Sequence, residues 1–109
     1  TDNLLGIEEF QKIELRSGVI LSAEEVPNSR RLIKLQVDLG SEQRQVVAGI
    51  KHVYAAADIV GKKVVVVTTL KPAKIMGVES QGMVLAASDG DALSLVAFDR
   101  EVKPGWKVR

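Results

Sequence analysis

The sequence predicts an all-β fold in which short strands close into a small barrel. Three observations lead to this prediction. Apolar and polar residues alternate with a period of two through much of the chain, as in half-buried strands. Glycine, proline and asparagine interrupt this alternation at short intervals, where turns are needed. Only one internal segment, residues 53–60, is rich in alanine and predicts a short helix.

The first segment predicts a short N-terminal helix over residues 4–13. Apolar side chains recur there at the spacing of one helical face. Asn3 can cap this helix, and the acidic pair Glu8 and Glu9 suits its first turns.

A long strand follows, because the period changes to two at Ile13. Gly18 interrupts this strand, and a glycine inside a strand often marks a bulge or a bend. Glu24 and Glu25 are expected on opposite faces, so they cannot form a shared acid–base site. One face of the strand carries Ile13, Leu15, Val19, Leu21 and Ala23, and the other carries Glu14, Arg16, Ile20, Ser22 and Glu24.

Turn residues and apolar runs define the remaining elements. In chain order they are a turn at 27–29, a strand at 33–39, a turn at 40–41, a strand at 43–50, the helix at 53–60 ended by Gly61, a strand at 64–70 suited to burial on both faces, a long loop at 71–81, a strand at 83–87, a turn at Asp89-Gly90, a strand at 93–98 and a short extended piece at 102–109. Five core strands with one helix between the third and the fourth are typical of the OB barrel. We therefore expect a five-stranded OB-fold barrel with a short N-terminal helix and extra C-terminal strands.

The composition narrows the class of protein. A chain of 109 residues corresponds to about one domain, and we expect residues 1–6 to be a linker or N-terminal extension and residues 7–109 to be that domain. Aromatic residues make up only 4% of the chain, so the core must consist of Val, Ile, Leu and Ala. The absence of cysteine excludes disulfides and fits a cytoplasmic location. No apolar run approaches the roughly 20 residues of a membrane helix. The start at Thr1 leads us to expect a fragment of a longer chain.

The net charge of +1 conceals an uneven distribution of charges. Residues 28–52 and residues 60–80 each carry an excess of Lys and Arg, whereas residues 1–27 are acidic. A nearly neutral protein can thus present one basic face, which attracts polyanions. The alternative is that these side chains only solvate the ends of strands.

The sequence offers no set of residues suited to catalysis. His52 is the only histidine, and Ser80 has no base nearby in the sequence. Asp89 and Asp91 flank a turn glycine, and turn formation explains both. We therefore expect no catalytic residue, no metal and no cofactor.

Binding of a folded RNA fits the residues better. Arg and Lys neutralise phosphates and release counterions. The aromatic residues, on which unpaired bases would stack, lie outside the second and third strands. This favours recognition of folded RNA through shape and backbone. The basic candidates are Arg16, Arg30, Arg31, Lys34, Arg44, Lys51, Lys71 and Lys74.

The segment from Leu70 to Met83, LKPAKIMGVESQGM, resembles the signature of the tRNA-binding domain at the C-terminus of many bacterial methionyl-tRNA synthetases and in stand-alone structure-specific tRNA-binding proteins. The resemblance extends over about residues 7–109. Further matching pieces are Phe10, Leu15-Arg16-Ser17-Gly18, Pro27-Asn28, Leu35-Gln36-Val37-Asp38-Leu39-Gly40, Val47-Ala48-Gly49-Ile50 and Ala86-Ala87-Ser88-Asp89-Gly90. This chain has Arg30-Arg31 where the family often has Asp-Lys, which makes the position more basic.

The resemblance implies an OB-fold that binds tRNA without catalysis and raises the affinity of a synthetase for its tRNA. It also implies a homodimer built by the N-terminal helix and the C-terminal segment, with the catalytic part of a synthetase in cis and no membrane. The alternatives are a stand-alone dimeric tRNA-binding protein and a chaperone-like peptide-binding module of the same fold. The residues that match the family motif are Asn28, Arg31, Lys74, Ser80 and Met83.

Three of these motif residues also have a structural explanation. Asn28 tolerates left-handed turn geometry, and Ser80 can brace a loop. A methionine at the start of a strand, such as Met83, is often a core residue.

Overall fold

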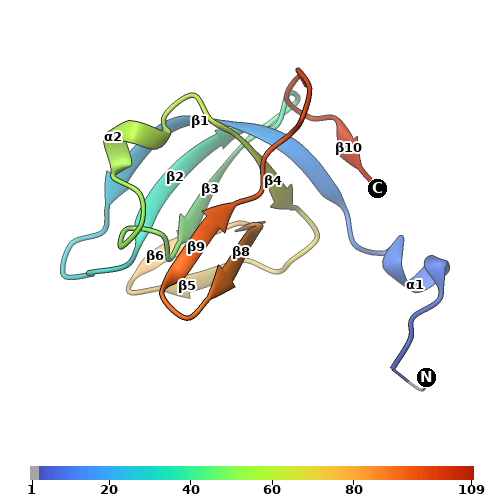
Figure 1. The fold of residues 1–109 in the computed structure, drawn as a ribbon, viewed down its shortest axis with the longest axis horizontal. Coiled ribbons are helices and arrows are strands. Elements are labelled where there is room, and N and C mark those ends of the chain that lie inside the picture. The colour runs from blue at the N-terminus through green and yellow to red at the C-terminus, as the bar shows by residue number, and fades with distance from the viewer. Residues whose placement is uncertain (1–2) are drawn as a thin grey trace.

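Five strands form the wall of the barrel, in the order β3-β2-β1-β4-β7 (Figure 1). The computed structural model describes residues 3–109. All strand pairs are antiparallel, and β10 adds to the first part of β1. The elements are α1 (Ile7–Phe10), β1 (Leu15–Glu25), β2 (Ile33–Asp38), β3 (Gln43–Ala48), α2 (Ala56–Ile59), β4 (Lys63–Val67), β5 (Ala73–Ile75), β6 (Val78–Ser80), β7 (Met83–Val84), β8 (Ala86–Asp89), β9 (Ala92–Leu95) and β10 (Lys107–Val108).

The barrel closes where the residues between β6 and β7 meet β3. The backbone N–H of Gln81 donates to the carbonyl oxygen of Gln45 at 2.7 Å, and the N–H of Gln45 donates to Oε1 of Gln81 at 3.0 Å. The N–H of Val47 donates to Oγ of Ser80 at 3.0 Å. These bonds satisfy the free edge of β3, which would otherwise expose unpaired backbone groups. The predicted five-stranded barrel is therefore confirmed, and the structure shows it nearly closed.

Strand β1 bends because an extra residue interrupts its pairing. Its first half pairs with β4 and its second half with β2, and the register with β2 shifts between Ile20 and Ser22. Ile20 is fully buried, Leu21 is 43% exposed, and Ala23 again packs against the core. The predicted assignment of residues to the two faces is thus wrong beyond Ile20, because a bulge changes which face the following residues occupy.

Gly18 does not mark the bulge, contrary to the expectation from the sequence. A Cβ atom at this position would lie 2.5 Å from Cγ1 of Val37 and 3.1 Å from Cδ2 of Leu39. Glycine is needed at Gly18 because side chains of β2 and of the following turn cross β1 closely at this point.

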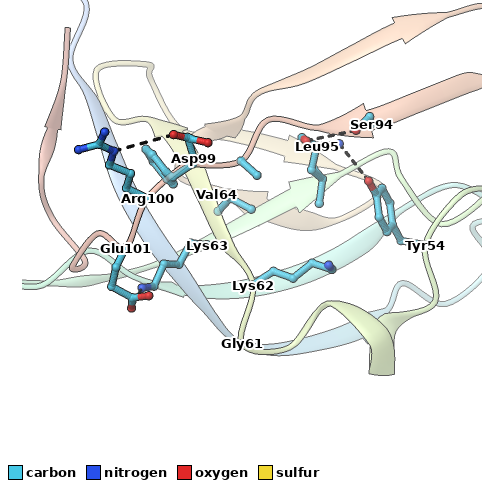
Figure 2. A pocket seen from close by; sticks show the side chains of 12 residues that line it. Tyr54, Gly61, Lys62, Lys63, Val64, Ser94, Leu95, Asp99, Arg100 and Glu101 are labelled. Atoms are coloured by element: carbon cyan, nitrogen blue, oxygen red, sulfur yellow. Dashed lines mark hydrogen bonds and ion pairs between the residues drawn. The ribbon is translucent and has the colours of Figure 1, made fainter.

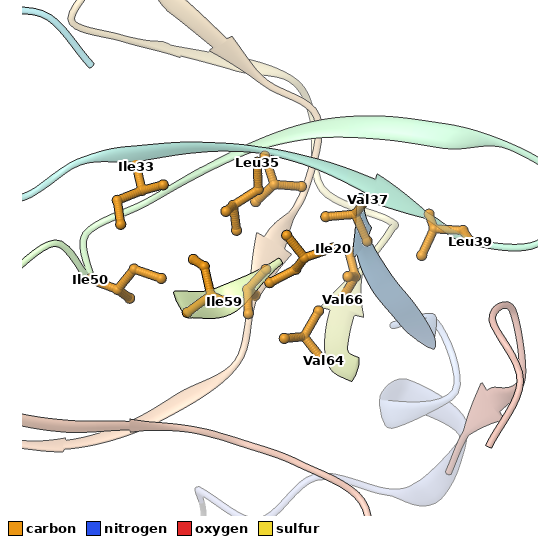
Figure 3. Close-up of a cluster of buried hydrophobic side chains, with 11 residues drawn as sticks. Ile20, Ile33, Leu35, Val37, Leu39, Ile50, Ile59, Val64 and Val66 are labelled. Atoms are coloured by element: carbon orange, nitrogen blue, oxygen red, sulfur yellow. The ribbon is translucent and has the colours of Figure 1, made fainter. Parts of the chain in front are cut away.

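The core inside the barrel is aliphatic, as the low aromatic content predicted (Figure 3). The run Val64–Val67 is buried on both faces of the sheet, which confirms the expectation for this strand, although β4 ends before residues 68–70. The buried cluster consists of Ile20, Ile33, Leu35, Val37, Leu39, Val46, Ile50, Ile59, Val64, Val66 and Val84.

Both helices are shorter than predicted. The N-terminal helix α1 has four residues, and Gly6 occupies its N-cap without a side-chain hydrogen bond. Asn3 is therefore not the cap. Helix α2 also has four residues and begins three residues later than expected, at Ala56. Among residues 3–109 no helix is both long enough and apolar enough to cross a membrane.

The predicted long loop at 71–81 is instead a β-hairpin. Strands β5 and β6 pair through Ile75 and Val78, which leaves a two-residue turn at Met76 and Gly77. Both turn residues have positive φ, 51° and 81°, as a type I′ hairpin turn requires. The prediction of a loop was wrong because Pro72 and Gly77 lie at the base and the tip of a hairpin and do not break a strand.

The C-terminal third of the chain forms more and shorter strands than predicted. The strand expected at 83–87 is split into β7 and β8, and β9 ends at Leu95. The β8–β9 turn consists of Gly90 and Asp91, one residue later than expected, because Asp89 pairs with Ala92. Buried Ser17 ties the chain end to β1, since its Oγ donates to the carbonyl oxygen of residue 103 at 2.6 Å.

Candidate nucleic-acid interface

Basic side chains gather around the β1–β2 turn, at one end of the barrel. The N–H of Lys51 donates to the carbonyl oxygen of Arg31 at 2.9 Å, and Nζ of Lys51 donates to the carbonyl oxygen of Ser29 at 3.3 Å. Lys34 points away from the core because its neighbours on β2 are buried. We call the following set the turn cluster: Asn28, Arg30, Arg31, Lys34 and Lys51.

The β5–β6 hairpin, which carries Lys74, reaches this cluster through Val78. Val78 of the hairpin lines a groove together with Lys34, and Lys74 pairs across the hairpin with Glu79. The hairpin is anchored on β3, since Nε2 of Gln45 donates to the carbonyl oxygen of Glu79 at 2.7 Å. Two basic segments far apart in the sequence thus meet at one end of the molecule.

The basic side chains of the turn cluster and Lys74 form few ion pairs, and these pairs are weak. The ion pairs lie on the surface, and such pairs contribute about 0–1 kcal/mol each. Arg30 and Lys74 form no ion pair with any residue from 3 to 109. The pairs are Arg31–Asp91 at 3.2 Å, Lys34–Glu24 at 3.3 Å and Lys51–Glu25 at 3.1 Å. A phosphate can replace Asp91 on Arg31 at little cost.

Arg16 lies far from the turn cluster. It is near the start of β1, roughly 30 Å along the strand from Glu25 at about 3.3 Å per residue. Its Nε donates to Oε1 of Glu14 at 2.7 Å and its Nη1 to the carbonyl oxygen of Gly105 at 3.2 Å. Hydrogen bonds from Arg16 and then Thr68 lower the pKa of Glu14 to about 2, and the bond to Glu14 raises the pKa of Arg16. Arg16 therefore holds together the N- and C-terminal segments.

Lys71 and Arg44 also lie apart from the turn cluster. Lys71 is exposed and precedes the hairpin, next to a groove near the start of β3 that Arg44 and Pro72 line. Nη1 of Arg44 donates to the carbonyl oxygens of Thr68 and Gln81 at 2.7 and 3.2 Å, so this guanidinium braces the barrel closure. The turn cluster lies at the opposite end of β3, where Ala48 pairs with β2.

The three uncharged motif residues have different surroundings. Asn28 is exposed in the turn with a φ of 66°, a conformation that asparagine tolerates. Ser80 is 5% exposed, and its Oγ accepts from Val47 and donates to the carbonyl oxygen of Gly82 at 2.9 Å. Met83 is 46% exposed on β7 and is not a core residue. Ser80 is thus a brace inside the structure, whereas Asn28 and Met83 are accessible to a partner.

Sequence reasoning missed a cavity of about 620 Å³ between the start of β4 and the segment after β9 (Figure 2). The hydroxyl of Tyr54 accepts a hydrogen bond from the N–H of Leu95 at 3.1 Å, and Lys63 forms an ion pair with Glu101. Residues 3–109 contain no group of His, Cys, Asp and Glu side chains that could hold a metal ion. No local pattern reveals this cavity, because residues 54–64 form one wall and residues 94–101 form the other.

Sequence reasoning also assigned Glu24 and Glu25 to opposite faces of one strand. Both in fact line a second, smaller groove beside Lys34, because they stand at the very end of β1. The ion pair between Arg31 and Asp91 was missed as well, since only the tertiary fold brings the β8–β9 turn to Arg31.

The chain is similar to known proteins over nearly its whole length. A family model described as "Putative tRNA binding domain" matches residues 15–107. Methionine–tRNA ligase of Thermotoga maritima is 55% identical over 106 residues, which cover 97% of this chain and 17% of the ligase. The ligase of Methanococcus maripaludis strain C5 is 51% identical, with 97% of this chain and 16% of the ligase covered. The chain therefore spans only about a sixth of the length of these relatives.

Two solved structures share the whole fold. A MetRS related protein from Pyrococcus horikoshii has a TM-score of 0.92 and 38% identity, with 98% of this chain and 99% of that chain covered. Chaperone CsaA of Bacillus anthracis has a TM-score of 0.88 and 28% identity, with coverage of 97% and 99%.

Proposed function

The chain belongs to the tRNA-binding domain family, and on this premise we propose that its turn cluster and the adjoining hairpin bind the ribose–phosphate backbone of a folded tRNA, without catalysis. The observation that carries this proposal is that Lys51 is hydrogen-bonded to the β1–β2 turn beside Arg31, which gathers cations of two separate segments at one end of the barrel. The hairpin that carries Lys74 reaches the same end through Val78. We place this function in the cytoplasm.

Backbone contacts suit the side chains of this end. Arg31 can hold a phosphate with two parallel hydrogen bonds, and Lys74 and Arg30 can act as point charges or donors without first leaving an ion pair. The turn cluster contains no aromatic residue on which bases could stack. Binding should therefore depend on the shape and charge of the RNA far more than on its sequence.

We further propose that the domain acts as an appended part of a methionyl-tRNA synthetase. The two ligase relatives match this chain with a sixth of their length, which supports a catalytic part elsewhere in the same polypeptide. A tethered second binding site raises the effective concentration of tRNA at the catalytic part, so overall affinity increases without a new contact there.

The end opposite the turn cluster supports the proposal of a homodimer. Helix α1 stands off the barrel near the C-terminus (Figure 1) and leaves Leu5 and Ile7 each 67% exposed. Trp106 of the C-terminal segment is 51% exposed. Sedimentation equilibrium should give twice the monomer mass for the native chain and the monomer mass for Ile7→Asp. A native monomer at high protein concentration would refute the homodimer.

A gel-shift titration tests the binding of folded tRNA. Folded tRNA should bind more tightly than the same tRNA unfolded or than duplex RNA. Arg31→Ala and Lys74→Ala should each weaken binding for all tRNAs alike and reduce the log–log salt slope by about 0.7 to 0.9. Lys62→Ala removes the same charge outside the turn cluster and serves as the control. A salt-independent affinity, or a loss confined to one tRNA species, would contradict recognition of the backbone.

Peptide binding is a second candidate function, favoured by the fold likeness to chaperone CsaA. The identity of 28% is about half of that to the Thermotoga ligase, so tRNA binding remains our first candidate. A competition assay distinguishes tRNA binding from peptide binding. If tRNA binding is the function, an excess of unfolded peptide should leave the tRNA complex intact. Tight binding of the peptide in the absence of any tRNA binding would favour the chaperone function.

A further inference from the structure

A small groove of about 200 Å³ lies between the end of β1, strand β2 and the β5–β6 hairpin. Its apolar walls are Val26, Pro27 and Val78. Val26 is only 3% exposed, and its N–H donates to the carbonyl oxygen of Leu32 at 3.3 Å. The hairpin that supplies Val78 is anchored on β3 by Ser80. Hydrogen bonds therefore anchor the elements on both sides of the groove.

The polar rim of this groove carries two carboxylates and one ammonium group, from Glu24, Glu25 and Lys34. Oε2 of Glu24 lies 3.3 Å from Nζ of Lys34, and Oε1 of Glu25 lies 3.1 Å from Nζ of Lys51. The side chains of the two glutamates are 67% and 61% exposed. A carboxylate offers about four acceptor sites, so each retains room to accept further N–H donors.

The apolar walls and the two carboxylates of this groove disfavour binding of a phosphate and favour binding of a nucleobase. Two adjacent carboxylates repel a phosphate at short range. A base edge instead presents N–H donors, and carboxylates of Asp and Glu accept hydrogen bonds from base amino groups. Lys34 can donate to a carbonyl oxygen on the same edge, and the walls at Val26, Pro27 and Val78 can receive the ring face, as apolar side chains do for unstacked bases.

We propose that this groove holds one unstacked guanine or cytosine of the bound RNA, while the turn cluster holds the phosphates around it. Guanine and cytosine both carry an amino group and a carbonyl oxygen on one edge, which match a carboxylate and Lys34. The groove is continuous with the backbone site, because Lys34 belongs to both. This inference rests on the proposed function and adds one base-specific contact to an otherwise sequence-independent interface.

Glu24→Met tests the inference because charge and base recognition predict opposite results. The substitution removes a negative charge and frees Lys34, so backbone attraction alone would tighten tRNA binding. Loss of the base contact should instead weaken binding by about tenfold, a loss that persists at high salt because this hydrogen bond releases no counterions. Glu79→Met on the hairpin is the matched control, since this carboxylate lies outside the groove, and its loss should tighten binding by up to about threefold.

Chemical probing of the bound tRNA provides an independent measurement. Kethoxal modifies unpaired guanine, and dimethyl sulfate modifies unpaired cytosine, at the base edge. One such base should be protected by the native chain and exposed in the complex with Glu24→Met. Glu25→Met should behave like Glu24→Met and replaces it if that variant does not fold.

The results separate failure of this inference from failure of the proposed function. If the native chain does not bind folded tRNA, both fail. If the native chain binds but Glu24→Met and Glu25→Met bind equally or more tightly, or if no unpaired base is protected, only the base groove is refuted.

Discussion

Substitution of Ser80 by alanine should destabilise the fold and leave the tRNA-binding surface intact. Ser80 matches a motif position for which tRNA contact was expected, but its side chain is almost fully buried. Its Oγ accepts from the N–H of Val47 on β3 at 3.0 Å and donates to the carbonyl oxygen of Gly82 at 2.9 Å. The hydroxyl thus joins the hairpin base to the barrel, and its single hydrogen is used inside the fold.

The size of the effect follows from these two bonds. Alanine leaves the buried N–H of Val47 without an acceptor, which costs about 1–3 kcal/mol, and it removes the bond to Gly82. We expect the free energy of unfolding of Ser80→Ala to fall by about 2 kcal/mol. For a domain of about this length, that corresponds to a decrease of roughly 10 °C in Tm.

Urea denaturation and tRNA titration at low temperature together check this reasoning. The midpoint for Ser80→Ala should fall, whereas the affinity for tRNA at 10 °C, where the variant is folded, should stay within about twofold of the native value. Ser88→Ala on exposed β8 is the control and should change stability by less than about 0.5 kcal/mol. A stable variant that has lost its tRNA affinity would show that the hydroxyl contacts RNA and is not a brace.

Two further predictions concern stability. Met76→Asn should raise the free energy of unfolding by about 0.5–1 kcal/mol, because asparagine tolerates the φ of 51° that methionine adopts at the hairpin tip; a lower urea midpoint would contradict a left-handed conformation there. The hydrogen bonds from Arg16 and Thr68 that lower the pKa of Glu14 to about 2 contribute stability that is fully present above the unfolded-state pKa of about 4.5 and is lost as the pH falls toward 2. The Tm of the native chain should therefore exceed that of Glu14→Gln at pH 7, and the difference should shrink between pH 4.5 and pH 2; a gap that is the same at both ends of this range would refute the assignment.

Several features could be predicted because they depend on only a few neighbouring residues. The alternation from Ile33 to Asp38 places every second side chain in the core, as observed. The run of valines in β4 is buried on both faces, and the hydrophobic cluster is aliphatic, as the composition required. The motif between Leu70 and Met83 indicated the family, although not the hairpin that part of this motif forms.

Other features depend on contacts between segments that are distant in the sequence. The bulge after Ile20 lies where β1 changes its pairing from β4 to β2. The residue type of Leu21 alone does not predict this bulge. Arg16 and Arg31 look equally suited to bind phosphate in the sequence, yet one joins the chain termini and the other lies on the exposed turn cluster.

The sequence by itself determined the alternation in β2, the burial of β4, the aliphatic core and the family, because each depends on residue type and short-range spacing. Only the tertiary structure decided which cations share a surface and that Glu24, Glu25 and Val78 enclose one groove. The physical reason is closure of the barrel. Pairing of residue 45 with residue 81 brings the hairpin against β3, and this long-range bond has no counterpart in any local pattern.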